Sequence, residues 1–169
     1  DLIPGQIWVS GVQRVLQSLL GERVSIRDLP NVLEGVSEAC GYSRNVTMIT
    51  EHVRARLARQ ISDNSADQTG VIPILTLSPE WEQAFTEALH GDGEEKQLVM
   101  APTTLQQFIQ LVRQAFERHT IMGESPVLLT SPAIRPYVRS IIERFRPITT
   151  VMSQNEIHAR ARIRTLGQI

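Results

Sequence analysis

The sequence has little of several features that specialised proteins need. It contains a single cysteine, Cys40, in 169 residues, so no disulfide can form within the chain, which fits a reducing compartment. No apolar run approaches the roughly 18 to 20 residues that a membrane-spanning helix requires, and the chain does not open with the charged and then apolar pattern of a signal peptide. Aromatic residues make up only 5%, so the core must be built mainly from Leu, Ile, Val and Ala.

An excess of charge of either sign is also missing. There are 17 Lys and Arg residues against 18 Asp and Glu, which gives a net charge of -1 and removes the bulk attraction that nucleic-acid binding proteins rely on. The length and the hydrophobic fraction of 41% fit one ordinary globular domain or two small ones. Because the chain opens mid-pattern at Asp1 rather than at a methionine, we expect it to be a piece of a longer protein.

Hydrophobic periodicity divides the chain into two parts. Residues 1–64 predict a small helical subdomain of three helices, one ending at Gly21, one between Asp28 and Gly41, and one from Thr47 to Ile61. The polar segment DNSADQTG at 63–70 has the composition of a linker.

Residues 70–169 predict a second, α/β subdomain. Short strands alternate with helices, and the two junctions Leu77–Pro79 and Thr130–Pro132 combine a serine cap with a proline. The expected fold class is therefore α+β or α/β, with the helical subdomain followed by an α/β sandwich. The predicted strands are 71–77, 97–100, 127–130, 149–152 and 162–169, and the predicted helices are 80–90, 102–122 and 132–145.

The last predicted helix has one continuous apolar face. This face predicts that the helix covers the sheet, and that arginines along it such as Arg139 are exposed and contribute little to stability. The apolar positions are Ile134, Val138, Ile141, Ile142 and Phe145.

Charge is distributed unevenly along the second half. Residues 63–95 contain eight acidic residues and no basic one, whereas residues 135–164 contain seven arginines against two glutamates. One interpretation is two solvated faces of opposite sign. The other is electrostatic complementarity, either between neighbouring copies of the chain or toward a partner.

No pattern of residues predicts catalysis, a cofactor or a metal. Both strand-to-helix junctions lack the glycines of a phosphate-binding loop. Cys40 lies on an apolar helical stripe, where cysteine behaves as a small hydrophobic residue. The four histidines are scattered, with no metal-ligand spacing: His52, His90, His119 and His158. We therefore expect no catalytic, cofactor-binding or metal-binding residue, and no binding of nucleic acid.

Several longer strings, taken together, resemble one protein family. The strings VQRVLQSLLGERVSIRDLPNVLEGVSEA (12–39), TEHVRARLARQI (50–61), ILTLSPEWEQAFTEAL (74–89), PVLLTSPAIRPYVRSIIERFRP (126–147) and TTVMSQNEIHARARIRTLGQI (149–169) are similar to the flagella/HR/invasion protein export pore (FHIPEP) family. They follow the family order over essentially the whole chain. The residues MSQNEIHARARIRT of the last string resemble the flagellar branch of the family more than the virulence branch.

The resemblance implies a role in type III protein export. Members of this family have an N-terminal membrane domain and a cytosolic domain of several subdomains, arranged as a ring below the export channel at the bacterial inner membrane. The chain is similar to the last two of these subdomains. The resemblance thus implies a non-enzymatic docking platform whose partners are other copies of itself, export chaperones with their substrates, and other export components. It implies contact with the membrane only through the absent N-terminal region.

Two further predictions remain open at the level of sequence. Charged residues outside the apolar stripes of the helical subdomain are predicted to contact neighbouring copies in the ring, although local capping and an ordinary helix pair would explain them equally well. These residues are Arg27, Asp28, Glu51 and Arg54. The rival functions are a virulence homologue of the same family and an unrelated small α/β enzyme or ligand-binding domain.

Overall fold

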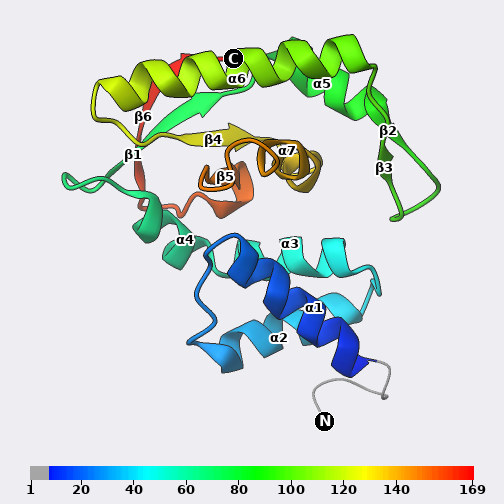
Figure 1. Cartoon of the computed structure of the whole chain (residues 1–169). Helices are drawn as coiled ribbons and strands as arrows, with labels where there is room; N and C mark the ends of the chain where they lie inside the picture. Colours follow the sequence, from blue (N-terminus) through cyan, green and yellow to red (C-terminus); the bar gives the residue numbers. More distant parts are fainter. Residues whose placement is uncertain (1–7) are drawn as a thin grey trace.

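A computed structural model describes residues 8–169. A parallel sheet lies in the middle of the molecule, with α5 and α6 above it and the helices of the N-terminal part below it (Figure 1). Helices and an α/β unit thus follow one another along the chain, and the fold class predicted from the sequence is confirmed.

The N-terminal part consists of α1 (Trp8–Gly21), α2 (Leu29–Cys40), α3 (Val46–Arg56) and α4 (Ala58–Ser65). As predicted, Asp28 caps α2, and its side chain accepts a hydrogen bond from the Asn31 amide at 3.4 Å. The prediction of one helix over 47–61 is wrong, because the backbone breaks at Leu57 and α4 starts anew. The prediction rested on apolar residues spaced four apart. This spacing continues across the break at Leu57, and the apolar residues before and after the break are buried.

The sheet has four parallel strands in the order β5-β4-β1-β6. Their bounds are β1 Val71–Thr76, β4 Val127–Thr130, β5 Val151–Ser153 and β6 Arg162–Gln168. The strand predicted at 97–100 does not join this sheet. It forms β3 (Gln97–Leu98), which pairs antiparallel with β2 (Leu89–His90) as a separate hairpin.

Three helices cover one face of the sheet: α5 (Pro79–Ala88), α6 (Pro102–Ile121) and α7 (Arg135–Ile142). The apolar face predicted for the last helix is confirmed, because its aliphatic residues are buried and Phe145 packs partly against them. The helix itself is shorter than predicted. Ser131 does not cap it, and its amide instead donates to the Glu82 carboxylate at 3.0 Å.

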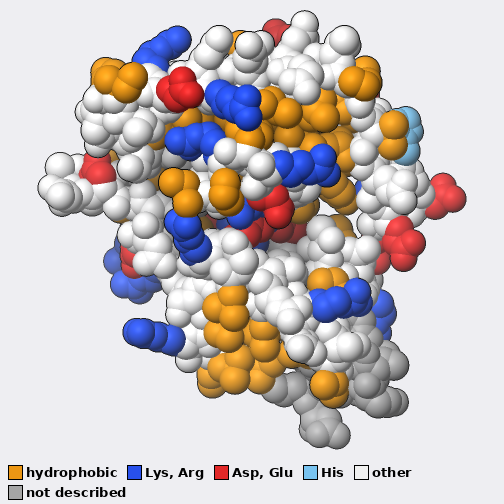
Figure 2. Space-filling view, viewed as in Figure 1, with side chains coloured by type: hydrophobic (Ala, Val, Ile, Leu, Met, Phe, Trp, Pro, Cys, Tyr) orange, Lys and Arg blue, Asp and Glu red, His pale blue; other side chains and the backbone are white. Residues whose placement is uncertain are grey.

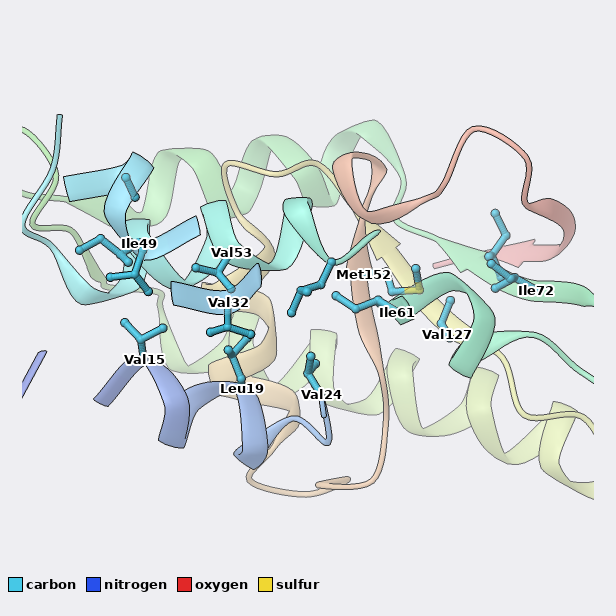
Figure 3. Close-up of a cluster of buried hydrophobic side chains, with 14 residues drawn as sticks. Val15, Leu19, Val24, Val32, Ile49, Val53, Ile61, Ile72, Val127 and Met152 are labelled. Carbon is cyan, nitrogen blue, oxygen red and sulfur yellow. The ribbon is translucent and has the colours of Figure 1, made fainter. Parts of the chain in front are cut away.

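Strand alternation gives the sheet two buried faces. Leu75, Leu128 and Val151 point toward α5, α6 and α7. The residues between them, such as Ile74 and Met152, belong to a second core that also contains the apolar residues of α1, α2 and α3 (Figure 3). The core of the N-terminal helices is therefore continuous with the lower face of the sheet, and the two parts pack as one body.

The chain connects β5 to β6 through a short 3-10 helix, η1 (Gln154–Glu156). This segment packs against α3 and α4, so it lies between the sheet and the N-terminal helices. None of the helices within residues 8–169 is long and apolar enough to cross a bilayer.

The burial of both faces of the sheet leads to a test of stability. Ile141→Ala should lower the free energy of unfolding by about 2–5 kcal/mol, because the Ile141 side chain lies on the buried face of α7, in the core that α7 shares with α5, α6 and the sheet. Ile163→Ala is the matched control, since this isoleucine of the edge strand is 47% exposed, and should cost less than about 1 kcal/mol. Urea midpoints measure both changes, and equal midpoints would contradict this account of the core.

Candidate functional site

Three arginines and three glutamates gather where the N-terminal helices meet the α/β unit. They come from the end of α1, from α3, from α7 and from η1, segments that lie far apart in the sequence. Figure 2 shows acidic and basic side chains deep in the hollow between the upper and lower halves of the molecule. We call this group the charge cluster, and its members are Glu22, Glu51, Arg54, Arg135, Arg139 and Glu156.

Arg54 connects α3 to η1. Its guanidinium forms two parallel hydrogen bonds with the Glu156 carboxylate, at 2.7 Å from Nε and 2.9 Å from Nη2. Both side chains are almost fully buried, Arg54 with 1% of its surface exposed. One oxygen of Glu156 also accepts the Ser153 amide at 3.2 Å and closes a capping box around η1. The pair therefore ties the β5–β6 connection to the N-terminal helices.

Arg135 lies at the centre of the cluster and is 1% exposed. It forms two hydrogen bonds of 2.9 Å with Glu22 and two of 2.8 Å with Glu51. Its Nη1 also donates to the Val151 carbonyl at 2.9 Å. One guanidinium thus joins α7 and β5 to the end of α1 and to α3. Paired forks of this kind are among the stronger hydrogen bonds in proteins.

The prediction that Arg139 is exposed is wrong. Only 7% of this residue is exposed, and its Nη1 donates to the carbonyls of Thr149 at 2.8 Å and Pro147 at 3.1 Å. Arg135 and Arg139 are one helical turn apart on α7, opposite the aliphatic face. The sequence of the α/β unit alone suggests that this face meets solvent, whereas the N-terminal helices cover it.

Two nitrogen atoms of the cluster make no hydrogen bond to any of the residues that the structure describes. Arg54 Nη1 and Arg139 Nε are buried and unpaired in this sense, and each lies 3.6 Å from the same oxygen of Glu22. Glu22 therefore faces three guanidinium groups. The total formal charge of the cluster is nevertheless zero, which limits the cost of burying it.

The surroundings shift the pKa of two carboxylates in opposite directions. Burial by itself would raise the pKa of Glu22, but the hydrogen bonds and charge of Arg135, with the charges of Arg54 and Arg139, lower it below its ordinary value of 4.5. For Glu51, burial outweighs the hydrogen bonds from Arg135, and the nearby Glu156 adds to it, so the pKa is raised. The same hydrogen bonds overcome the burial of Arg135 and raise its pKa.

The four residues predicted to contact a neighbouring copy have different environments. Glu51 and Arg54 lie in the charge cluster, so their polar contacts are within the chain. Arg27 and Asp28 lie exposed at the corner between α1 and α2, where the Arg27 amide donates to Ser25 Oγ at 3.2 Å. Of the four, Arg27 and Asp28 are exposed, whereas Glu51 is partly buried and Arg54 is buried.

Sequence reasoning missed Glu22, Arg135, Arg139 and Glu156 as members of one group. The available signal was a helix with two arginines one turn apart on the side opposite its apolar face. Nothing in the sequence shows which carboxylates they meet, because Glu51 and Glu22 lie 84 to 117 residues away from them. Within residues 8–169, no three His, Cys, Asp or Glu side chains are placed to hold a metal ion.

Comparisons with known proteins agree with the resemblance. The model of the FHIPEP family matches residues 1–162. The flagellar biosynthesis protein FlhA of Caulobacter vibrioides is 62% identical over 169 residues, which are 100% of this chain and 24% of that protein. The chain therefore spans about a quarter of the length of this relative.

Solved structures share the fold. The Chlamydia pneumoniae CdsV protein superimposes with a TM-score of 0.88 and 30% identity, over 99% of this chain and 47% of that one. CdsV has also been solved in complex with the CdsO protein. The nonameric EscV cytosolic domain from the type III secretion system gives a TM-score of 0.79 and 26% identity, over 97% of this chain and 48% of that one.

The geometry of Arg135 generates a first test of the cluster. Arg135→Met should lower the free energy of unfolding by about 3–5 kcal/mol, because it leaves Glu22 and Glu51 buried without the guanidinium that they share. Arg118→Met, on the exposed side of α6, is the control and should change stability by less than about 0.5 kcal/mol. Equal urea midpoints for the two variants would show that the cluster does not stabilise the fold.

The opposite pKa shifts generate a second test. Glu22 has a lowered pKa, so its contribution to stability is complete above pH 4.5 and is lost as the pH falls through its folded value. Glu51 has a raised pKa, so acidification favours the fold at this residue. Between pH 7 and pH 4, Glu22→Gln should lose less stability than the unmodified protein, and Glu51→Gln should lose more. Urea midpoints at both pH values measure this, and the reverse order would refute the assigned directions.

Proposed function

This chain belongs to the FHIPEP family, and we propose that it forms part of the cytosolic region of a flagellar type III protein export gate. The observation that carries this proposal is the 62% identity, over the whole chain, to a protein named for flagellar biosynthesis. The virulence branch is the second candidate, supported by the fold shared with a cytosolic domain from a type III secretion system at 26% identity. Family membership sets aside an unrelated α/β enzyme or ligand-binding domain.

The proposed role is that of a ring-forming platform. A structural neighbour of this chain is described as nonameric, which supports assembly of the full-length protein into a homo-oligomeric ring. A subunit of a ring must hold its shape so that every contact repeats. The charge cluster and the continuous core supply this by fixing the N-terminal helices to the α/β unit.

In this role the ring docks export chaperones with their substrates and meets other export components. The complex of CdsV with CdsO supports the second kind of partner. The platform works without catalysis, cofactor or nucleic acid. It is held at the cytoplasmic side of the bacterial inner membrane by regions of the full-length protein outside this chain.

We assign contact between copies to the corner formed by Arg27 and Asp28. Both residues are exposed, and Asp28 also caps α2, so the corner has a fixed backbone shape. Exposed charges at an interface set register and partner choice more than raw affinity. Glu51 and Arg54 belong to the charge cluster and are not assigned to this contact.

The test uses the full-length protein in a bacterium that lacks its own copy. Arg27→Glu should impair ring assembly, measured by sedimentation, and reduce motility and protein export, while the melting temperature changes by less than about 2 °C. Arg118→Glu, an equal charge reversal on exposed α6, should leave all four properties near those of the unmodified protein. An unchanged oligomer distribution with Arg27→Glu would refute the interface, and full motility without the gene would refute the function.

A further inference from the structure

The β2–β3 hairpin exposes carboxylates that have no partner within the described chain. Every residue of its tip, 91–96, is exposed, and Asp92, Glu94 and Glu95 form no ion pair with any of residues 8–169. The one cation of the tip, Lys96, turns back and donates to the Gly91 carbonyl at 3.0 Å. The tip therefore presents three negative charges outward.

The backbone of the tip has a defined shape. Gly91 has a φ of 131°, which side chains disfavour, and a Cβ at this position would lie 2.2 Å from the Glu95 carbonyl oxygen. Only glycine permits this close approach. The carboxylates are thus carried on a built turn, whose position is fixed by the pairing of β2 with β3.

A cleft of about 880 Å³ lies at the other end of α6. It opens between the α4–β1 turn and the α6–β4 turn, over the first residues of β4 and the segment leading into β5. Arg23, Arg146 and Arg164 line it. Two carboxylates also line it, but both are occupied: Asp67 accepts from Thr69 and Val71, and Glu124 accepts from His119 and Arg164.

Two of the cleft arginines keep their charge available. Arg146 lies over the ring of Phe116, 4.8 Å from its centroid, and donates to Thr149 Oγ1, so it has no carboxylate partner among residues 8–169. Arg23 forms no side-chain hydrogen bond or ion pair with that part of the chain. It has a φ of 63° at the end of α1, where the Val24 amide closes onto the Leu19 carbonyl, a position that glycine ordinarily takes.

The hairpin and the cleft cannot meet within one chain. β3 leads directly into the first turn of α6, and the cleft lies beside the last turn of this 20-residue helix. A helix of that length spans about 30 Å, and Figure 1 shows the hairpin and the α6–β4 turn on opposite sides of the molecule. The acidic tip and the arginines can therefore neutralise each other only between two copies.

We propose that the acidic β2–β3 hairpin of one copy docks in the arginine-lined cleft of the next copy. The occupant of the cleft is a second copy of this chain, because its tip carries unpaired carboxylates on a protruding turn and the recess offers free guanidinium groups. Two different surfaces at opposite ends of a molecule make a head-to-tail contact, and such contacts form a ring where the rotation from one copy to the next closes, or an open filament where it does not. This inference rests on the ring assembly proposed above and specifies one of its contacts.

Charge variants in the full-length protein test the contact. Arg23→Gly removes the cation and supplies the residue that the backbone favours, so it should keep or raise the melting temperature while weakening self-association by about tenfold. Glu94→Arg should weaken self-association similarly, and Arg23→Glu combined with Glu94→Arg should restore it toward that of the unmodified protein. The inference would be overturned if Arg23→Glu and Glu94→Arg each folded but the combination of the two did not restore self-association.

Cross-linking separates this contact from ring assembly in general. With Cys40 and any cysteine in the rest of the full-length protein replaced by alanine, Arg23→Cys and Glu94→Cys in the same chain should give a ladder of disulfide-linked oligomers after oxidation, whereas neither single variant should pass beyond a dimer. A ring by sedimentation without a ladder would overturn the docking of the hairpin and leave the proposed function standing. Absence of any ring for the unmodified protein would overturn both.

Discussion

The structure depends on one buried guanidinium, that of Arg135, held between the carboxylates of Glu22 and Glu51. Taking these charges out of water is costly, and only complete pairing offsets the cost. Four hydrogen bonds of 2.8 to 2.9 Å to the two carboxylates, and a fifth to the Val151 carbonyl, supply that pairing. Because the partners come from α1 and α3, this pairing exists only when the N-terminal helices sit against α7 in one register.

Apolar packing and the charge cluster have different consequences at this junction. The lower face of the sheet shares its core with α1, α2 and α3, and such packing is roughly proportional to the buried area and tolerates small shifts. Paired forks on buried carboxylates do not tolerate them, because a displaced partner leaves a desolvated charge. The core thus supplies an attraction that tolerates small shifts, whereas the cluster is fully paired in one arrangement only.

The sequence was sufficient for features that depend on neighbours along the chain. The Asp28 cap, the strands β1 and β4, and the aliphatic face of α7 follow from local pattern. The break at Leu57 is missed because the apolar stripe runs through it, and the pairing of the strand at 97–98 with β2 is missed because a short strand does not indicate its partner. Arg139 was placed in solvent because periodicity shows that a face is polar and does not show what covers it. The charge cluster could not be predicted, because its pairs are up to 117 residues apart.

The two kinds of charge in this molecule respond differently to their surroundings. The cluster is neutral and buried, so salt screens it weakly, and it keeps the N-terminal helices and the α/β unit together as one body. The hairpin tip and the Arg27–Asp28 corner are exposed, where screening acts within about 8 to 10 Å at physiological ionic strength. Contacts between copies made through such exposed charges weaken with salt while the shape of each copy does not change. In the proposed ring, salt therefore acts on the contacts between copies and not on the shape of each subunit.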